Sequence, residues 1–206
     1  MRTGVFGGTF DPVHYGHLLL AETARERLAL DRVLFVPAGI PPHKRTRKIT
    51  SGEDRAEMLQ RALRDIPEFE LCRYEIDSPE VSFTYKTLRH LRELFPRDLF
   101  FLIVGSETLA DIPNWRFPDE VCRLASIAAA RRPGAPIEDF SGFSPYVNEE
   151  RIAEFRRQIL PMPLIELSST AIRQRTAEGR SIRFLTPETV VAYIRENVLY
   201  SPAKSD

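Results

Sequence analysis

The chain alternates short apolar runs with segments whose apolar residues recur every three or four positions. Runs of the first kind predict strands, and segments of the second kind predict amphipathic helices. The strongest run is Leu99–Val104, which is apolar at every position, as expected for a strand buried on both faces of a parallel sheet. Strands that alternate with helices along a chain form a parallel sheet with helices on both faces. We therefore expect an α/β fold built on a doubly wound parallel sheet.

The same patterns predict where the individual elements lie. Strands are expected at Thr3–Phe6, Val33–Val36, Phe69–Ile76, Leu99–Val104, Ser126–Ala130 and Leu164–Leu167. Helices are expected at Gly16–Leu30, Ser51–Asp65, Thr84–Phe95, Asn148–Leu160, Ser169–Glu178 and Pro187–Asn197. Residues 198–206 are expected to form a frayed tail.

Length and charge restrict the class of protein. With 206 residues the chain suits one domain, 1–206, in which we expect residues 168–200 to form a small C-terminal helical part. Its 29 basic and 29 acidic residues cancel, whereas proteins that coat nucleic acids or membrane surfaces need a basic excess. We therefore expect no nucleic-acid partner and no membrane partner. Nothing in the sequence favours a monomer over a homo-oligomer.

Apolar runs and cysteine usage indicate the compartment. No run approaches the roughly 18 apolar residues that span a membrane, and no signal peptide is recognisable at the N-terminus. Cys72 and Cys122 stand in apolar or amphipathic surroundings, so we interpret them as buried thiols rather than as a disulfide. We expect a cytoplasmic protein.

The stretch GGTFDPVHYGH, residues 7–17, gathers glycines and histidines directly behind the first predicted strand. Ligands of doubly wound sheets bind at the carboxyl ends of the strands, where this stretch and the long segment 37–50 both begin. The glycines lack the G-x-G-x-x-G spacing of a dinucleotide fingerprint, and no Gly-Lys-Ser/Thr of a P-loop follows. A hydride-transferring enzyme and a P-loop NTPase are therefore disfavoured.

Three interpretations remain for His14 and His17, which straddle the predicted helix start and share one side of its first turn. They could bind zinc, but His43 and His90 are the only other histidines and a third ligand is hard to find. They could help to bind an anion, because a helix N-terminus presents unpaired N–H groups and glycines let a phosphate approach the backbone. They could also be surface histidines on a plain glycine turn. The residues favour the anion site.

Two segments of the sequence resemble the signatures of one superfamily. GGTFDPVHYGH resembles the H-x-G-H signature of the HxGH nucleotidyltransferase superfamily, which follows the first strand. The superfamily's second signature is a Ser/Thr-rich helix start with a basic residue one turn later, and Ser168-Ser169-Thr170 followed by Arg173 is similar to it. Taken alone, this second segment is more often a plain capped helix, with Ser169 as the capping residue.

Further segments resemble one family, the bacterial-type nicotinate mononucleotide adenylyltransferases. The similar segments are Ile40-Pro41-Pro42-His43-Lys44, the helix start with Ser51, Arg55 and Met58, Ser82–Leu88, Gly105-Ser106-Glu107, Trp115, Arg132-Pro133-Gly134 and the stretch from Ser181. The resemblance spans residues 4 to about 200. It implies a Rossmann-like nucleotidyltransferase fold. The family usually has Asp where Glu107 stands.

The resemblance implies a reaction between ATP and nicotinate mononucleotide that gives nicotinate adenine dinucleotide and pyrophosphate in NAD biosynthesis. The attacking group is a phosphate oxygen that is ionised at neutral pH, so no general base is needed. Catalysis then consists of positioning two polyanions and neutralising their charge. Magnesium would enter with ATP, mostly ligated by water, and we expect no dedicated metal ligand from the protein.

The resemblance also implies roles for individual residues. The catalytic residues would be His14, His17, Lys44 and Arg173. ATP would be bound by Gly7, Gly8, Thr9, Phe10, His14, His17, Gly105, Glu107, Ser168, Ser169, Thr170 and Arg173. Nicotinate mononucleotide would be bound by Thr9, Asp11, Lys44, Thr84, Trp115, Arg116 and Arg132. Within this set Trp115 would stack on the pyridine ring, and backbone N–H groups at Thr84 and Arg116 would hold the ring carboxylate.

Three other functions are compatible with parts of this sequence. Another transferase of the same fold, such as a pantetheine-phosphate adenylyltransferase or a cytidylyltransferase, lacks the PPHK segment and Trp115. An enzyme that prefers the nicotinamide mononucleotide differs only in substrate choice. A nucleotide-binding regulator with this fold would bind ATP without releasing pyrophosphate.

Overall fold

The computed structural model describes residues 1–39, 49–131, 140–163 and 165–201. Within these residues six parallel strands form one sheet in the order β3-β2-β1-β4-β5-β6. The strands are β1 (Arg2–Gly8), β2 (Arg32–Pro37), β3 (Phe69–Leu71), β4 (Leu99–Val104), β5 (Ala125–Arg131) and β6 (Leu160–Pro161). The chain order reverses between β1 and β4, which is the switch point where doubly wound sheets bind ligands. The predicted fold class is confirmed.

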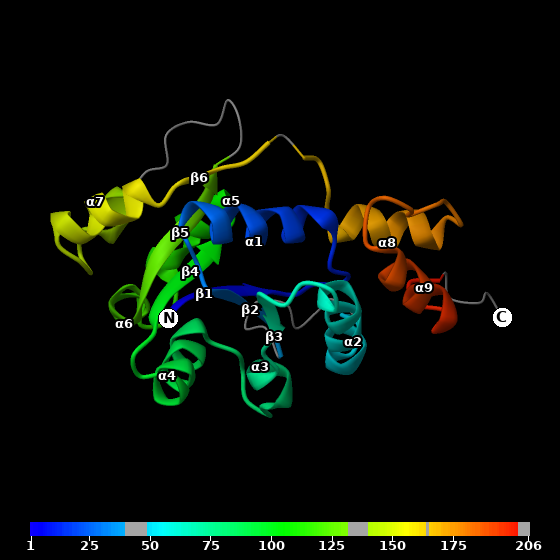
Figure 1. Ribbon diagram of the computed structural model, residues 1–206, viewed down its shortest axis with the longest axis horizontal. Helices are drawn as coiled ribbons and strands as arrows, with labels where there is room; N and C mark the ends of the chain where they lie inside the picture. The colour runs from blue at the N-terminus through cyan, green and yellow to red at the C-terminus, as the bar shows by residue number, and fades with distance from the viewer. Residues whose placement is uncertain (40–48, 132–139, 164, 202–206) are drawn as a thin grey trace.

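Helices cover both faces of this sheet, with α1 on one side and α3 and α4 on the other (Figure 1). The helices are α1 (Tyr15–Arg27), α2 (Gly52–Leu63), α3 (Tyr74–Asp77), α4 (Thr84–Leu94), α5 (Ser106–Asp111), α6 (Pro118–Leu124), α7 (Glu149–Arg157), α8 (Ser169–Ala177) and α9 (Glu188–Glu196). Short 3₁₀ turns occur at Ile112–Asn114 and Ser141–Phe143. In the described part of the chain, no helix is both long and apolar enough to cross a membrane.

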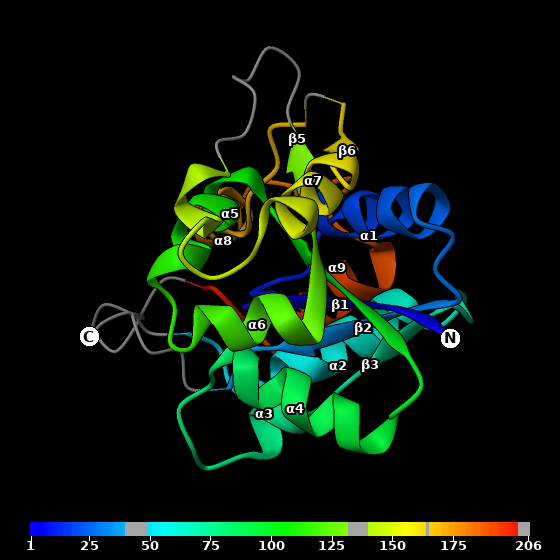
Figure 2. The same cartoon turned by 90° about the vertical axis from the view of Figure 1, so that its left-hand side faces the viewer.

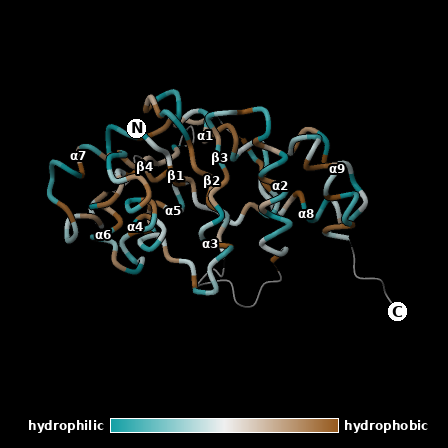
Figure 3. Tube along the Cα trace, turned by 60° about the horizontal axis from the view of Figure 1, so that its bottom comes forward, coloured by the Kyte–Doolittle hydropathy of each residue, from teal (hydrophilic) through white to brown (hydrophobic). Residues whose placement is uncertain are grey.

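Alternating strand residues feed two separate cores. On β4, Phe101 and Ile103 pack toward α1, α2, α8 and α9. Phe100, Leu102 and Val104 of the same strand pack toward α4, α6 and α7. A strand with apolar side chains at every position is what a sheet buried on both faces requires, and Figure 3 shows hydrophobic residues concentrated along the central strands.

Two predicted strands are placed differently by the structure. The segment Phe69–Ile76 is extended only through Leu71, and Tyr74 begins the short helix α3. The strand expected at Leu164–Leu167 lies earlier, at Leu160–Pro161, where it pairs with Ala130 and Arg131 of β5. Helix α7 consequently ends at Arg157 rather than at Leu160. Tertiary pairing with a neighbouring strand decides such short segments, and local composition does not.

Helices α8 and α9 lie together beside α2 at one end of the molecule (Figures 1 and 2). They cover most of the predicted C-terminal helical part, 168–200. The frayed tail predicted for residues 198–206 is wrong for residues 198–200, and residues 202–206 lie outside the described residues. Leu199 and Tyr200 pack against the core on the α1 side of the sheet, and the Leu199 N–H donates to the Ile194 carbonyl at 3.0 Å.

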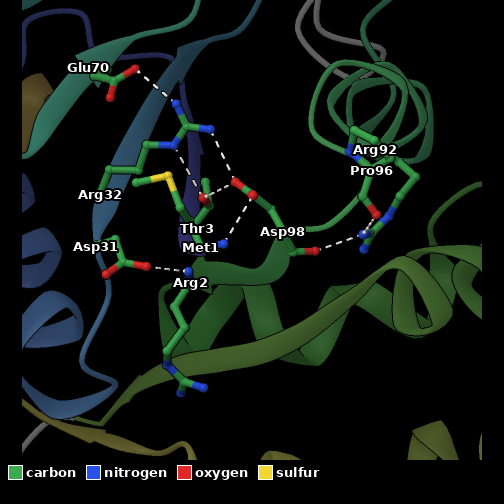
Figure 4. A network of polar contacts seen from close by, with 9 residues as sticks. All are labelled: Met1, Arg2, Thr3, Asp31, Arg32, Glu70, Arg92, Pro96 and Asp98. Atoms are coloured by element: carbon green, nitrogen blue, oxygen red, sulfur yellow. Dashed lines mark hydrogen bonds and ion pairs between the residues drawn. The ribbon is translucent and has the colours of Figure 1, made fainter.

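The amino ends of the strands are joined by a polar network around Asp98 (Figure 4). Its carboxylate accepts hydrogen bonds from the Thr3 hydroxyl at 2.8 Å, from Arg32 at 3.1 Å and from the Met1 amino group at 3.2 Å. Burial by itself would raise the pKa of Asp98, but these three donors outweigh it and lower the pKa. The network ties β1, β2 and the start of β4 together at the edge opposite the ligand-binding edge.

Candidate active site

A cavity of about 1080 Å³ opens at the carboxyl ends of β1 and β4. Every predicted site residue in the described part of the chain lines it. These residues are Gly7, Gly8, Thr9, Phe10, Asp11, His14, His17, Thr84, Gly105, Glu107, Trp115, Arg116, Ser168, Ser169, Thr170 and Arg173. The predicted Lys44 and Arg132 lie outside the described residues. We call this cavity the crevice.

The loop after β1 is shaped by Phe10, which has a left-handed φ of 49°. Its ring is fully buried and packs edge-on against Phe6 with centroids 5.4 Å apart. Gly8 leaves room for this ring, since a Cβ there would lie 2.9 Å from it. The Thr9 carbonyl accepts a hydrogen bond from the buried Arg55 guanidinium at 2.9 Å. These contacts hold the loop in place where it lines the crevice.

His14 and His17 stand at the start of α1. His14 is the N-cap residue, and its ring stacks on that of His17 with centroids 3.7 Å apart. The His14 backbone N–H donates to His17 Nδ1 at 3.2 Å. A nitrogen that accepts carries no proton, so a neutral His17 has its proton on Nε2. His17 is thereby prepared to donate a hydrogen bond from Nε2.

Both imidazoles are neutral at neutral pH. Burial lowers the pKa of His14 to about 4. Burial and the neighbouring His14 hold the pKa of His17 well below its ordinary range. Among the described residues His14 Nδ1 is buried and has no hydrogen-bond partner. A buried polar atom of this kind is commonly satisfied by a ligand or water.

The lack of a side chain at Gly16, which lies between the two histidines, has a steric explanation. A Cβ at this position would lie 3.1 Å from Cε1 and Nδ1 of the His14 ring. That separation is tighter than an ordinary contact, so the imidazole would have to shift. Glycine at the second helical position therefore lets the His14 ring lie over the first turn of α1.

Helix α8 begins beside the start of α1, and the two helices run in opposite directions (Figure 1). Ser168, not Ser169, caps α8, because its hydroxyl accepts from the Ala171 N–H at 3.1 Å. Ser169 instead donates to the Pro12 carbonyl at 2.8 Å and ties the two helix starts together. The predicted cap is one residue off, since Ser169 already has helical geometry.

Arg173 completes the positive end of the crevice. Its Nη1 donates to the Asp11 carbonyl at 2.6 Å, and its Nη2 donates to the Thr170 hydroxyl at 3.3 Å. The N-termini of α1 and α8 add the positive ends of two helix dipoles. Two helix starts, a guanidinium and a donating imidazole form a site for a polyanion such as a polyphosphate.

The other end of the crevice is aromatic and bears further donors. Thr84 is the first residue of α4, and Trp115 follows the 3₁₀ turn Ile112–Asn114. Trp115 is half-buried against the core, while Arg116 is exposed with its guanidinium 5.5 Å from the Phe83 ring. A tryptophan on the wall of a cavity can stack on a flat heterocycle.

Gly105 and Glu107 lie between these two ends, at the carboxyl end of β4. Gly105 is the N-cap of α5, and Glu107 lies in the first turn of that helix. Both line the crevice. A carboxylate there can accept hydrogen bonds from hydroxyl groups, such as those of a ribose.

Sequence reasoning missed several polar residues of the crevice and its wall. Glu75 lines the crevice, accepts from the Thr87 hydroxyl at 2.6 Å and has a pKa raised by burial. Ser82 accepts from the Gly39 N–H at 3.0 Å. The sequence predicts a strand at Glu75, so only its position in α3, in contact with α4, shows that it belongs to the crevice wall. Ser82 and Arg55 stood in recognised segments without an assigned role.

The two histidines could hold a metal ion only together with further ligands. Within residues 1–39, 49–131, 140–163 and 165–201, no group of three or more His, Cys, Asp or Glu side chains could hold a metal ion. The stacked histidines therefore have no third ligand among these residues. The zinc interpretation gains no support from this geometry, and the anion interpretation matches the two helix starts and Arg173.

Comparisons with known proteins agree with this geometry. The family model described as cytidylyltransferase-like matches residues 5–175. A protein of Roseiflexus castenholzii named probable nicotinate-nucleotide adenylyltransferase is 44% identical over 97% of this chain and 98% of its own length. A relative of the same name from Desulfitobacterium hafniense is 40% identical over 97% of this chain and 95% of its own.

Solved structures show the same fold. The nicotinic acid mononucleotide adenylyltransferase of Plasmodium falciparum, in complex with NaAD, aligns with a TM-score of 0.71. The alignment covers 97% of each chain at 19% identity. The same parasite enzyme in complex with APC aligns with a TM-score of 0.70. At this level of identity the likeness concerns the arrangement of the sheet and its helices.

Proposed function

The chain belongs to the nicotinate-nucleotide adenylyltransferase family, and we propose that it transfers the adenylyl group of ATP to nicotinate mononucleotide. The products are nicotinate adenine dinucleotide and pyrophosphate, as needed in NAD biosynthesis. The observation that carries this proposal is one crevice with a polyanion site at the starts of α1 and α8 and an aromatic wall at Trp115. We take residues 1–206 as one nucleotidyltransferase domain.

The chemistry is one in-line displacement at the α-phosphorus of ATP. A phosphate oxygen of nicotinate mononucleotide forms the new O–P bond, the bond to the β-phosphate bridging oxygen breaks, and pyrophosphate leaves with that electron pair. The attacking phosphate is already ionised, so no proton has to be removed. The protein therefore contributes position and positive charge, not a general base.

The triphosphate end would lie at the two helix starts. Arg173 and the N-terminus of α8, with Ser168, Ser169 and Thr170, face the β- and γ-phosphates in this assignment. His17 Nε2 and the imidazole of His14 donate to phosphate oxygens on which charge accumulates in the transition state. Gly7, Gly8, Thr9 and Phe10 supply close backbone approach, and Gly105 and Glu107 hold the adenosine ribose. The neutral state of both histidines supports donation without an added charge.

The mononucleotide end would lie between α4 and the Trp115 segment. Trp115 stacks on the pyridine ring, and the backbone N–H groups of Thr84 and Arg116 bind the ring carboxylate. Thr9 and Asp11 lie between the two substrates. Fixed N–H donors disfavour an amide group, because its NH₂ would face them without an acceptor. We extend the assignment to Lys44 and Arg132, which lie outside the described residues.

Magnesium enters this scheme as part of the MgATP substrate. Bound to ATP and mostly to water, the ion offsets phosphate charge that Arg173 and the helix dipoles leave unbalanced. The protein side needs only donors around the polyphosphate. The carboxylates of the described crevice wall, Asp11, Glu75 and Glu107, stand on separate elements, which supports a scheme without a dedicated protein site for the ion.

We also propose that the enzyme works in the cytoplasm with small-molecule partners alone. The balanced charge of the chain supports this, since nucleic-acid and membrane-surface binders carry a basic excess. Cys72 and Cys122 are free thiols in the structure; Cys122 is buried as expected, whereas Cys72 is only half-buried. Burial raises the pKa of both thiols, for Cys122 to about 11, so they are unreactive at neutral pH.

The test is pyrophosphate release from MgATP with nicotinate mononucleotide and nicotinamide mononucleotide offered in parallel. We expect a strong preference for the acid, as the donors at Thr84 and Arg116 require. Comparable use of the amide keeps the adenylyl transfer and removes the carboxylate pocket. Release with neither acceptor, although ATP binds, contradicts the proposal and favours a nucleotide-binding regulator or another transferase.

A further inference from the structure

The hydroxyl of Tyr200 donates a hydrogen bond to Asp11 Oδ1 at 2.7 Å, and thereby joins residues 189 positions apart in the chain. Asp11 lies in the loop that holds the phosphate-binding residues, whereas Tyr200 follows the last helix. We infer that Tyr200 is a positioning residue for the triphosphate end of the crevice, acting through Asp11 on Arg173. This inference rests on the proposed use of ATP and adds a residue that is not on the crevice wall.

The chain is bent sharply to bring Tyr200 to this place. Val198 and Tyr200 both adopt left-handed φ angles, 53° and 61°. This conformation is unfavourable for side chains with a Cβ and persists where surrounding contacts enforce it. The Tyr200 ring packs against the core on the α1 side, and its hydroxyl lies 3.9 Å from the sulfur of Met58.

Asp11 connects Tyr200 to Arg173 on the crevice wall. Its side chain is almost fully buried, and Oδ2 lies 3.4 Å from the Thr50 N–H and 4.0 Å from the Arg173 guanidinium. The Asp11 carbonyl accepts from Arg173 Nη1 at 2.6 Å. With Oδ1 held by Tyr200, the carboxylate cannot rotate away from Arg173. The guanidinium is then presented to the polyphosphate in one orientation.

The phenol is suited to this task. Burial and the adjacent Asp11 raise the pKa of Tyr200, so its hydroxyl stays protonated at neutral pH and can only donate toward the carboxylate. Arg55, which holds the Thr9 carbonyl and the Thr50 carbonyl, supports the same loop from another side. Tyr200 and Arg55 thus fix the two ends of residues 9–11.

A matched control exists in the same part of the chain. Tyr193 of α9 donates its hydroxyl to Asp54 Oδ1 at 2.8 Å, so it too joins the C-terminal region to an aspartate. Asp54 lies on α2 and is not part of the crevice wall. Tyr200→Phe and Tyr193→Phe each remove one oxygen and keep the ring. A purely structural role of Tyr200 would give the two variants the same consequences.

The experiment measures the Kd of MgATP and of nicotinate mononucleotide by calorimetry, together with the melting temperature. We expect Tyr200→Phe to weaken MgATP about fivefold, a change the size of one lost hydrogen bond. The mononucleotide Kd should rise less, because Asp11 is only one of its assigned contacts. Tyr193→Phe should lower the melting temperature similarly and leave both Kd values at the wild-type level. Equal ATP affinities in the two variants, or a loss confined to the mononucleotide, would overturn the inference.

A double-mutant cycle with Asp11→Ala tests the route. If Tyr200 acts through Asp11, Tyr200→Phe has no further effect on the MgATP Kd once Asp11 is gone, whereas additive losses contradict the inference. Because the readout is ATP binding without an acceptor, it is separate from the proposed function. Wild-type protein that binds MgATP but does not use nicotinate mononucleotide would remove the proposed function and leave the Tyr200 result valid.

Discussion

The ring of His14 is stacked on the ring of His17, with centroids 3.7 Å apart and planes inclined by 19°. Two imidazolium cations at this distance would repel each other, and burial already lowers the pKa of both rings. The pair is therefore held neutral, with the His17 Nδ1 occupied by the His14 N–H. Nε2 of His17 therefore carries the proton, and on the crevice wall it can donate a hydrogen bond to a ligand.

Replacing His17 should remove that donor. We expect His17→Ala to lower kcat by about 10²- to 10³-fold, the effect of losing one donor to charge developing in a transition state. The melting temperature should change little by comparison. The measurement is steady-state pyrophosphate release with saturating substrates.

The control for this variant is His90→Ala. His90 also stacks on another ring, Tyr74, with centroids 4.0 Å apart, but it is not on the crevice wall. It should keep wild-type kcat. Near-wild-type turnover in His17→Ala would contradict the assigned phosphate role.

The neutral histidines should also make the fold sensitive to acid. The unfolded chain takes up a proton on His14 as the pH falls through 6.5, whereas the folded protein resists until about pH 4. The contribution of His14 to the unfolding free energy is therefore fully present above pH 6.5 and is lost progressively as the pH falls toward 4. We expect the slope of unfolding free energy against pH to decrease by up to about 1.4 kcal/mol per pH unit in His14→Gln. Urea denaturation measures this slope, and identical slopes would show that His14 titrates normally.

Gly16 offers a test that separates activity from stability. Alanine in place of glycine favours a helix by about 1 kcal/mol, but its Cβ would press on the His14 ring at 3.1 Å. We expect Gly16→Ala to keep or raise the melting temperature and to lower kcat about tenfold, because small displacements of catalytic groups are costly.

Gly179→Ala is the control, because it should lower stability and leave kcat unchanged. Gly179 follows α8 with a left-handed φ of 68°, and nothing lies where its Cβ would be. Alanine there should cost about 1 kcal/mol of stability through backbone strain alone, with kcat unchanged. If Gly16→Ala lost stability and activity in parallel, the crowding of His14 would not be the cause.

The sheet could be predicted from the sequence because its strands and helices follow patterns that are local in the chain. The residues expected at the crevice followed from the family resemblance, since they come from segments far apart in the chain. Leu99–Val104 is a strand in any context, and residues 7–17 follow a strand and begin a helix. The short elements were missed or misplaced. Helices α5 and α6 are too short to show a period, and β6 exists only because residues 160–161 pair with β5.

Residues that act across long sequence distances could not be found in the same way. Tyr200 stands in a stretch that looks like an unstructured end, and Asp11 is 189 positions away. Ser168 and Ser169 are adjacent and chemically alike, so only backbone geometry shows that the first caps α8 and the second bonds to Pro12. Such assignments need the tertiary structure.

Trp115 allows a prediction about substrate choice. Its half-buried ring forms part of the crevice wall, and stacking on a heterocycle contributes about 1–3 kcal/mol. We expect Trp115→Ala to raise the KM of nicotinate mononucleotide about tenfold with a small effect on the KM of ATP. Trp115→Phe keeps an aromatic surface and should recover most of the affinity. An equal rise of both KM values in the alanine variant would count against stacking.

Asp98 gives a stability prediction at the edge of the sheet remote from the crevice. Its carboxylate holds Thr3, Arg32 and the Met1 amino group together (Figure 4). In Asp98→Asn the charge is lost and one oxygen becomes a donor that faces these donors. We expect a loss of about 2 kcal/mol at pH 7, measured by urea denaturation, with unchanged KM values.

The pH dependence of this difference has a definite sign. The folded protein lowers the pKa of Asp98 below its ordinary value of 3.8, so it holds the ionised form more firmly than the unfolded chain does. The contribution is complete above pH 3.8 and disappears as the pH falls through the lower, folded-state pKa. Wild type and Asp98→Asn should therefore differ most at neutral pH and converge once the pH has fallen below the folded-state pKa of Asp98. A difference that persists in strong acid would show that shape, not charge, holds the network together.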